Sequence, residues 1–239
     1  ILTVPMAAKE QVYYLYGGSA VKFSLVDLFQ GIFGAAGAGG AVALILAVLV
    51  GILCAGLVAA LFAAAIGTPV LRLKSDYLAI ATLGLAEILG ALFQWRTLGP
   101  ITNGANMLKS FPTFADFNIK NASGEVVLRL STFVPFLLAI LSIAVIVLLI
   151  HSSYGRAFKA IRDDEVAAEA MGISLFKHKM LSFVISSFFS GVGGALFAMY
   201  VSNAQAKAFI STMTYEILLI VVIGGIGSIS GSVIGTFLY

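Results

Sequence analysis

The sequence is poor in charged residues and in cysteine. Charged residues make up 10% of the chain, whereas soluble globular domains carry about 25%. The mean hydropathy is +1.06. Because a soluble fold of 239 residues could not bury this much apolar surface, the composition excludes a water-soluble domain and predicts an integral membrane protein. The one cysteine, Cys54, lies in an apolar run, which excludes a disulfide framework and a thiolate metal site.

Motifs for catalysis and for nucleotide binding are also absent from the sequence. There is no G-x-x-x-x-G-K-[ST] sequence, so the chain has no P-loop with which to bind ATP itself. The two histidines, His151 and His178, lack the spacing of metal ligands. We therefore expect no enzyme activity, no metal site and no cofactor in this chain. The net charge of +3 gives no reason to expect a nucleic-acid partner.

Long apolar runs dominate the rest of the sequence. A bilayer core about 30 Å thick needs roughly 20 apolar residues in a helix. Four runs of about that length lack Asp, Glu, Lys and Arg, and a fifth contains Glu87 and Arg96; they are 41–66, 132–150, 180–201 and 217–239, with 77–98 as the fifth. These runs predict an all-α integral membrane protein, a polytopic helical bundle with about five to six spans.

The first 40 residues are harder to interpret. Residues 23–40 are apolar but are interrupted by Asp27 and rich in glycine. The segment 1–40 is either an external or interfacial segment or the remnant of earlier spans, and both readings stay open. The chain starts with Ile1 and stops at Tyr239 inside an apolar run, so we expect it to be cropped from a longer protein. We expect residues 1–239 to form a single transmembrane domain.

The boundary between the first two runs has local signals. Gly67 can adopt a left-handed helix cap, and Pro69 prevents a helix from resuming. Ser75 and Asp76 can then cap the next helix. This pattern predicts a short turn over 68–76 between antiparallel spans.

Small residues recur every four positions along the runs. The sets are Gly51, Ala55, Ala59, Ala63 and Gly67; Ser186, Ser190, Gly194 and Ala198; and Gly227, Gly231 and Gly235. Such stripes let helix backbones approach closely where lipid is as apolar as the side chains. We interpret them as packing faces of a compact helical bundle.

Charge is concentrated in one segment between two apolar runs. Nine acidic and basic residues lie between Arg156 and Lys179. Asp163 or Asp164 can cap a helix that Gly172 ends, which predicts a two-turn helix over 164–171. An isolated helix of this length is marginal in water. The segment therefore either docks into a groove on a soluble protein or is a solvated cytoplasmic loop that is polar only because it lies outside the membrane.

Four ordered sequence blocks resemble one family. The segment GRAFKAIRDDEVAAEAMGI at 155–173 resembles the coupling loop of ABC importer permeases, above all the branched-chain amino-acid (LivM-type) family. The blocks RLKSDYLAI at 72–80 with TLG and EI after it, TNGAN at 102–106 and VIGGIGS at 222–228 resemble further blocks of that family. The resemblance runs from about residue 41 to 239, although Ala105 and Met107 replace the Pro and Gly that are usual there.

The resemblance implies a permease subunit of an importer for branched-chain or related hydrophobic amino acids. Its partners would be a second homologous permease, two cytoplasmic ATPase subunits that bind ATP and Mg²⁺, an external or periplasmic substrate-binding protein, and the lipid of a bacterial or archaeal plasma membrane. Segment 152–179 would be the cytoplasmic coupling loop. Its ATPase-coupling residues would be Gly155, Arg156, Arg162, Asp163, Asp164, Glu165, Ala167, Ala168, Met171 and Gly172.

Topology follows from the density of Lys and Arg in short loops. That density is higher in 67–76 and 151–179 than in the connections that alternate with them, so we expect both segments in the cytoplasm.

Candidate substrate-pathway residues are polar or glycine positions near the spans. Glu87 lies mid-run, where an ionisable side chain is costly and suggests a function. The other candidates are Thr102, Asn103, Asn106, Gly224 and Gly225. The glycines could unwind a helix where substrate passes, or could simply serve packing, and the 102–106 residues could form a plain turn.

Two other functions remain open. A permease of the same type could carry another small solute, such as urea or an amide, a sugar or a nucleoside. Alternatively, the chain could be a proton-coupled secondary carrier that uses Glu87.

Overall fold

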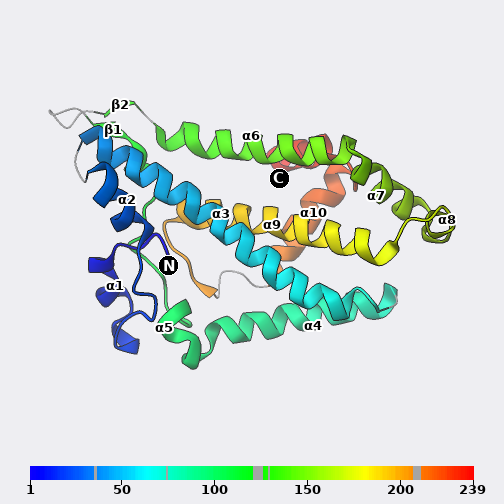
Figure 1. Cartoon of the computed structure of the whole chain (residues 1–239), viewed down its shortest axis with the longest axis horizontal. Coiled ribbons are helices and arrows are strands. Elements are labelled where there is room, and N and C mark those ends of the chain that lie inside the picture. Colours follow the sequence, from blue (N-terminus) through cyan, green and yellow to red (C-terminus); the bar gives the residue numbers. More distant parts are fainter. Residues whose placement is uncertain (35–36, 74, 121–125, 129, 207–210) are drawn as a thin grey trace.

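The computed structural model describes residues 1–34, 37–73, 75–120, 126–128, 130–206 and 211–239. Long helices lie side by side in a bundle, which confirms the predicted all-α membrane fold (Figure 1). The helices are α1 Met6–Val12, η1 Tyr14–Tyr16, α2 Leu25–Phe33, α3 Gly37–Val70, α4 Ser75–Gln94, η2 Arg96–Leu98, α5 Gly99–Thr102, η3 Phe114–Phe117, α6 Leu130–His151, α7 Ser153–Asp163, α8 Glu165–Ala170, α9 Leu175–Val201, α10 Ser211–Gly224 and α11 Ile229–Leu238. A short antiparallel pair, β1 Ile119–Lys120 and β2 Val126–Leu128, precedes α6.

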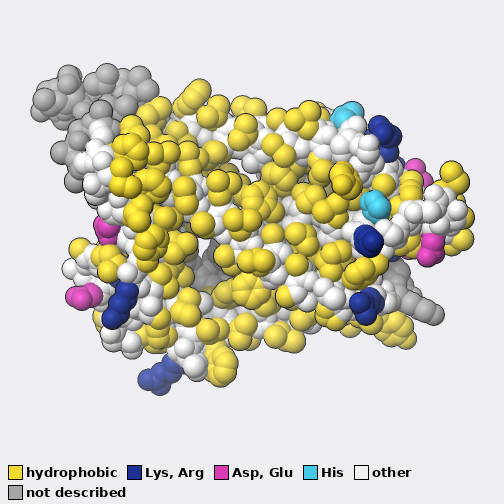
Figure 2. Space-filling view, in the orientation of Figure 1, with side chains coloured by type: hydrophobic (Ala, Val, Ile, Leu, Met, Phe, Trp, Pro, Cys, Tyr) yellow, Lys and Arg dark blue, Asp and Glu magenta, His cyan; other side chains and the backbone are white. Residues whose placement is uncertain are grey.

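Three helices among the described residues, α3, α6 and α9, are long and apolar enough to cross a membrane. The bent pair of α10 and α11 brings the number to four if the pair counts as one span, and α4 adds a shorter apolar helix over Ile80–Gln94. The 22 residues of α6 extend about 33 Å, close to the thickness of a bilayer core. In Figure 2, an almost uncharged apolar belt separates charged groups at the two ends of the bundle. The chain is therefore a multi-pass membrane protein.

Helices α3 and α9 pack closely through small residues. A Cβ atom on Gly191 would lie 2.8 Å from the carbonyl oxygen of Ala55 and 2.8 Å from Cβ of Ala59. A Cβ on Gly56 would lie 2.7 Å from the ring of Phe188. The packing role of the α3 stripe is thus confirmed. On α9 the contact runs through Gly191 instead of the predicted stripe, because Gly194 has no neighbour within 4 Å of the equivalent Cβ position.

The predicted end of the first span at Gly67 is wrong. Helix α3 continues to Val70 with Pro69 inside its last turn. The backbone of Gly67 is not left-handed. A Cβ on Gly67 would lie 3.0 Å from the ring of Phe183, so tertiary packing on α9 explains this glycine. Lys74 lies outside the described residues, as do the side chains of Ser75 and Asp76 at the start of α4, so their capping role stays a prediction.

The predicted apolar run over 217–239 is not one straight helix. Helices α10 and α11 meet at 115° across a break of four residues. Gly225 and Gly227 in this break have φ values of +92° and +89°, a left-handed conformation that favours glycine. The hydroxyl of Ser228 then accepts a hydrogen bond from the backbone N–H of Gly231 at 3.1 Å and caps α11. Of the two readings of the glycines, unwinding applies at Gly225 and Gly227.

The N-terminal segment forms short helices that pack on the bundle end opposite α8 (Figure 1). Helices α1 and α2 have seven and nine residues, too few to span a bilayer. The buried ammonium group of Lys9 donates hydrogen bonds to the carbonyl groups of Val21, at 2.8 Å, and Phe23. The hydroxyl of Tyr13 donates to the carbonyl of Ile101 at 3.1 Å, and burial raises the pKa of Tyr13 to about 12. The Lys9 bonds hold the segment together, and the Tyr13 bond fixes it to α5.

Candidate coupling site and pathway cavity

Local signals set where α8 begins and where it ends. Asp164 has an extended backbone, and its Oδ1 accepts hydrogen bonds from the N–H groups of Val166 and Ala167 at 2.8 and 3.0 Å. Gly172 has a φ of +85°, and the N–H of Ile173 returns to the carbonyl of Ala168 at 3.1 Å. The predicted cap and the predicted stop are both confirmed, with Asp164 rather than Asp163 as the cap.

Helix α7 was not predicted from the sequence, and it joins α8 to the span α6. The hydroxyl of Ser152 accepts a weak hydrogen bond from the N–H of Gly155 at 3.4 Å. A Cβ on Gly155 would collide with the carbonyl of Ile150, so this glycine allows a close approach at the α6–α7 junction. The rings of Phe158 and His178 meet edge to face with centroids 6.3 Å apart, and this contact fixes α7 against α9.

An ion pair holds α8 to α9, and a cation–π contact holds the chain after α3 to α9. The ammonium group of Lys179 on α9 pairs with Glu165 in the first turn of α8 at 2.7 Å. The guanidinium of Arg72, after α3, lies 5.3 Å from the ring centroid of Phe176 on α9, a favourable cation–π geometry. Helix α8 is thereby held at the extreme end of the bundle (Figure 1).

The surface of α8 combines apolar and charged side chains. Val166 and Met171 are 79% and 84% exposed, and Ala167 is exposed between them in sequence. Two predicted coupling residues, Gly155 and Ala168, are buried against their own chain. The other eight are exposed at this end: Arg156, Arg162, Asp163, Asp164, Glu165, Ala167, Met171 and Gly172. Val166 is absent from the predicted set, although an apolar residue two positions after the acidic cap could have marked it.

Arg162 connects the α7–α8 segment to the break between α10 and α11. Its Nε and Nη2 donate hydrogen bonds to Oδ1 of Asp163 at 3.1 and 2.9 Å. Its Nη1 faces the break, because a Cβ on Gly227 would lie 3.3 Å from that atom. A predicted coupling residue therefore lies beside the glycine cluster that was predicted for the pathway.

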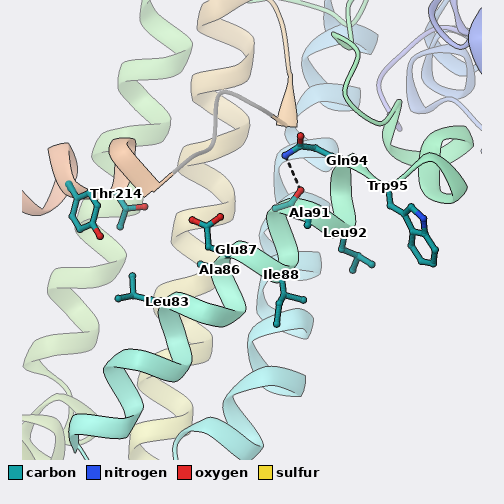
Figure 3. Close-up of a pocket in the computed structure, with 11 residues that line it drawn as sticks. Leu83, Ala86, Glu87, Ile88, Ala91, Leu92, Gln94, Trp95 and Thr214 are labelled. Carbon is teal, nitrogen blue, oxygen red and sulfur yellow. Dashed lines mark hydrogen bonds between the residues drawn. The ribbon is translucent and has the colours of Figure 1, made fainter.

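A cavity of about 720 Å³ lies between α4 and α10 and contains Glu87 (Figure 3). Glu87 points from α4 toward the start of α10, where Thr214 lies. Thr214 and Tyr215 of α10 line the cavity together with Gln94 of α4. Gln94, Thr214 and Tyr215 are not among the pathway residues predicted from the sequence. Gln94 follows Glu87 by seven positions, two helical turns, which places both on one helix face and could have indicated it.

The other predicted pathway residues do not line this cavity. The hydroxyl of Thr102 donates to the carbonyl groups of Phe93 and Leu98 at 2.9 and 3.1 Å. The side-chain amide of Asn103 is buried and donates to the carbonyl of Met107 at 3.0 Å. Thr102 thus ties α5 to the end of α4, whereas Asn103 stabilises the turn after α5. The N–H of Asn106 completes this turn by donating to the Asn103 carbonyl at 3.1 Å. Gly224 and Gly225 lie at the opposite end of α10 from Thr214.

Metal ligands do not cluster in the part of the chain that the structure describes, where no group of three or more His, Cys, Asp or Glu could hold an ion.

Comparison with known proteins identifies one family. Residues 25–239 match the family described as branched-chain amino acid transport system / permease component. The chain belongs to this permease family. It is 37% identical over 194 residues to the high-affinity branched-chain amino acid transport system permease protein LivM of Salmonella typhimurium and, to the same extent, of Escherichia coli. In each case the match covers 73% of this chain and 45% of the relative.

An archaeal relative shows the same similarity at lower identity. The probable branched-chain amino acid transport permease protein LivM of Methanocaldococcus jannaschii is 27% identical, over 82% of this chain and 54% of its own length. The chain therefore spans about half the length of the curated relatives that it matches. No solved structure matches it.

Proposed function

We propose that this chain is part of the membrane permease of an ABC importer that moves branched-chain or related hydrophobic amino acids into the cell. The family and the names of the relatives support the substrate class. The observation that carries the proposal is α8, a six-residue helix with a complete cap and stop that presents exposed Val166 and Met171 at the end of the bundle. Apolar side chains on a short outlying helix suit a groove on a second protein.

In the proposed importer, separate subunits supply energy, passage through the membrane and substrate. Two ATPase subunits bind ATP and Mg²⁺ and receive α8 in a groove, a second homologous permease completes the membrane pathway, and an external binding protein delivers the substrate. The chain itself is a transport subunit without catalytic residues, embedded in the plasma membrane of a bacterium or archaeon. In this arrangement 67–76 and 151–179 face the cytoplasm, because α8 meets a cytoplasmic ATPase.

The α4–α10 cavity is the part of the pathway that belongs to this chain. An acidic side chain within an apolar helix is costly in lipid, and such residues mark substrate pathways in membrane proteins. Glu87 lies in a cavity with two hydroxyl-bearing side chains, Thr214 and Tyr215. A carboxylate and hydroxyl groups can bind the charged ends of an amino acid, and the apolar lining can accept its side chain. The cavity supports a pathway role for Glu87 more than for Thr102 or Asn103, whose side chains bond to backbone carbonyl groups of Phe93 and Met107.

Uptake by the reconstituted importer tests the proposal. The full-length permease, with its second permease, ATPases and binding protein, is placed in proteoliposomes, and uptake of radiolabelled leucine is measured with and without ATP. ATP-dependent uptake that unlabelled isoleucine or valine competes away is the expected result. Uptake driven by a proton gradient without ATP would contradict the proposal and favour the carrier that uses Glu87.

A further inference from the structure

The side chain of Arg162 is oriented toward the four-residue break 225–228, which we call the elbow. Asp163 engages Nε and Nη2 of the guanidinium at 3.1 and 2.9 Å. The remaining terminal nitrogen, Nη1, lies against Gly227. A guanidinium has five N–H donors in a fixed plane, so a carboxylate on one edge sets the direction of the other. Asp163 thus occupies one edge of the guanidinium and leaves Nη1, which lies beside the elbow.

The elbow is a favourable place for a cation. Helix α10 ends at Gly224, and the last carbonyl groups of a helix lack partners within it and carry partial negative charge. Gly225 and Gly227 both have left-handed backbones, so neither position accepts a Cβ without strain. The absence of a Cβ at Gly227 also leaves room for the guanidinium, because a Cβ there would lie 3.3 Å from Nη1.

Helices α10 and α11 form a tightly packed hairpin. A Cβ on Gly224 would collide with the carbonyl oxygen of Gly231, and a Cβ on Gly231 would collide with that of Gly224. A Cβ on Gly235 would lie 2.8 Å from the carbonyl oxygen of Ile220. With backbones in contact at these glycines, the two helices have little freedom to move relative to one another. The hairpin is therefore packed as one body.

The far end of α10 lines the cavity. Thr214 and Tyr215 contribute to the wall opposite Glu87. Ten residues of helix separate Thr214 from Gly224, a length of about 15 Å. A tilt of the hairpin by about 10° at the elbow therefore moves Thr214 by about 2.5 Å, enough to change the width of the cavity.

We propose that the α10–α11 hairpin is a lever that transmits movement of the α7–α8 segment to the cavity beside Glu87. Arg162 is the positioning residue that holds this segment to the elbow of the lever. The inference rests on the proposed function, since the movement originates in ATPase subunits that contact α8. It goes further by naming the moving element and the contact through which the movement reaches the pathway.

A thiol reporter at the cavity tests the lever. Cys54→Ala removes the native thiol, and Thr214→Cys supplies one on α10. The rate of maleimide labelling is measured in the assembled importer without nucleotide and after trapping with ATP and vanadate. The labelling rate is expected to differ by at least about threefold between the two states, as for an element that moves when the pathway switches. Equal rates in an importer that retains its ATPases would overturn the proposal.

Arg162→Gln in the reporter background separates the lever from docking. This variant keeps polarity but removes the cation from the elbow. At equal amounts of bound ATPase, the nucleotide-dependent difference in labelling is expected to disappear. Lys159→Gln removes another exposed cation of α7 and is expected to preserve the difference. A difference that survives Arg162→Gln would overturn the lever. Release of the ATPases by Arg162→Gln would also overturn it, because Arg162 would then act in docking.

Gly227→Ala provides a second test that leaves Arg162 in place. The new methyl group strains a left-handed position and lies 3.3 Å from the guanidinium, so it should displace the contact and abolish the labelling difference. An unchanged difference would count against the contact. Failure of the parent importer to retain any ATPase would instead refute the proposed function, which keeps the two failures distinguishable.

Discussion

Lys179 on α9 donates a hydrogen bond to Glu165 on α8 across 2.7 Å, and this ion pair ties the outlying helix to a membrane span. Its two side chains are 35% and 55% exposed, so water and salt weaken the attraction. Exposed pairs of this kind contribute about 0–1 kcal/mol. The pair therefore orients α8 without anchoring it rigidly.

Lys179→Met should lower the affinity of the permease for its ATPase by no more than about fivefold, in line with the strength of such a pair. A titration of purified ATPase against the reconstituted permease measures the effect, and the difference from wild type should shrink at high salt. Lys177→Met is the matched control, because Lys177 is exposed on the same helix and has no ion-pair partner among the described residues. A loss of equal size in the control would remove the role assigned to the pair.

Gly172→Ala should destabilise the end of α8 through the backbone alone. No atom lies within 4 Å of the added Cβ position, whereas the φ of +85° is unfavourable for alanine, at a cost of about 1–2 kcal/mol. ATPase binding should fall about tenfold as α8 frays. Gly172→Asn is the control, since asparagine tolerates the left-handed region better, and it should restore most of the binding. Equal defects in both variants would argue against a conformational cause.

The features of α8 could be predicted because their causes are local. Asp164 caps N–H groups two and three residues ahead, and Gly172 ends the helix that the residues just before it form. The end of α3 could not be predicted in this way. Gly67 looks like a helix stop in sequence, yet the contact that explains it is with Phe183, more than a hundred positions away.

Gly191→Ala should destabilise the bundle at the α3–α9 contact. The added methyl would lie 2.8 Å from the Ala55 carbonyl oxygen, and overpacking of this kind typically costs about 1–3 kcal/mol. Thermal unfolding in detergent, followed by fluorescence, measures the effect. Gly194→Ala, three residues along the same helix, meets no atom within 4 Å and should leave the midpoint unchanged or raise it. Similar losses in the two variants would contradict the assigned contact.

The break between α10 and α11 shows another limit of sequence reasoning. An apolar run over 217–239 has the same composition whether it forms one straight span or two helices at 115°. The glycine cluster at 224–227 allowed either outcome. What decides between them is the contact of Gly224 with Gly231 across the hairpin, which exists only once the chain has bent.

Glu87→Gln should reduce transport while leaving assembly intact. The substitution keeps the shape of the side chain but removes the negative charge from the cavity, so we expect ATP-dependent leucine uptake to fall by about tenfold, the effect of losing one charged hydrogen bond. Glu216→Gln is the control, because Glu216 is an exposed acid on α10 that does not line the cavity. Normal uptake by Glu87→Gln, or an equal loss in both variants, would contradict the pathway role of Glu87.

The central claim is that α8 docks on an ATPase, and substitution of one exposed alanine tests it most directly. Ala167→Trp adds a large side chain to the exposed surface of α8, whereas Ala168→Trp would instead disturb the buried side. Leu148→Trp adds similar bulk to α6 at a position that is 71% exposed on its apolar surface. The measurement is the amount of ATPase that co-purifies with each variant at equal permease yield. The account predicts that Ala167→Trp loses most of the ATPase and that Leu148→Trp retains it; full retention by Ala167→Trp would contradict the docking of α8.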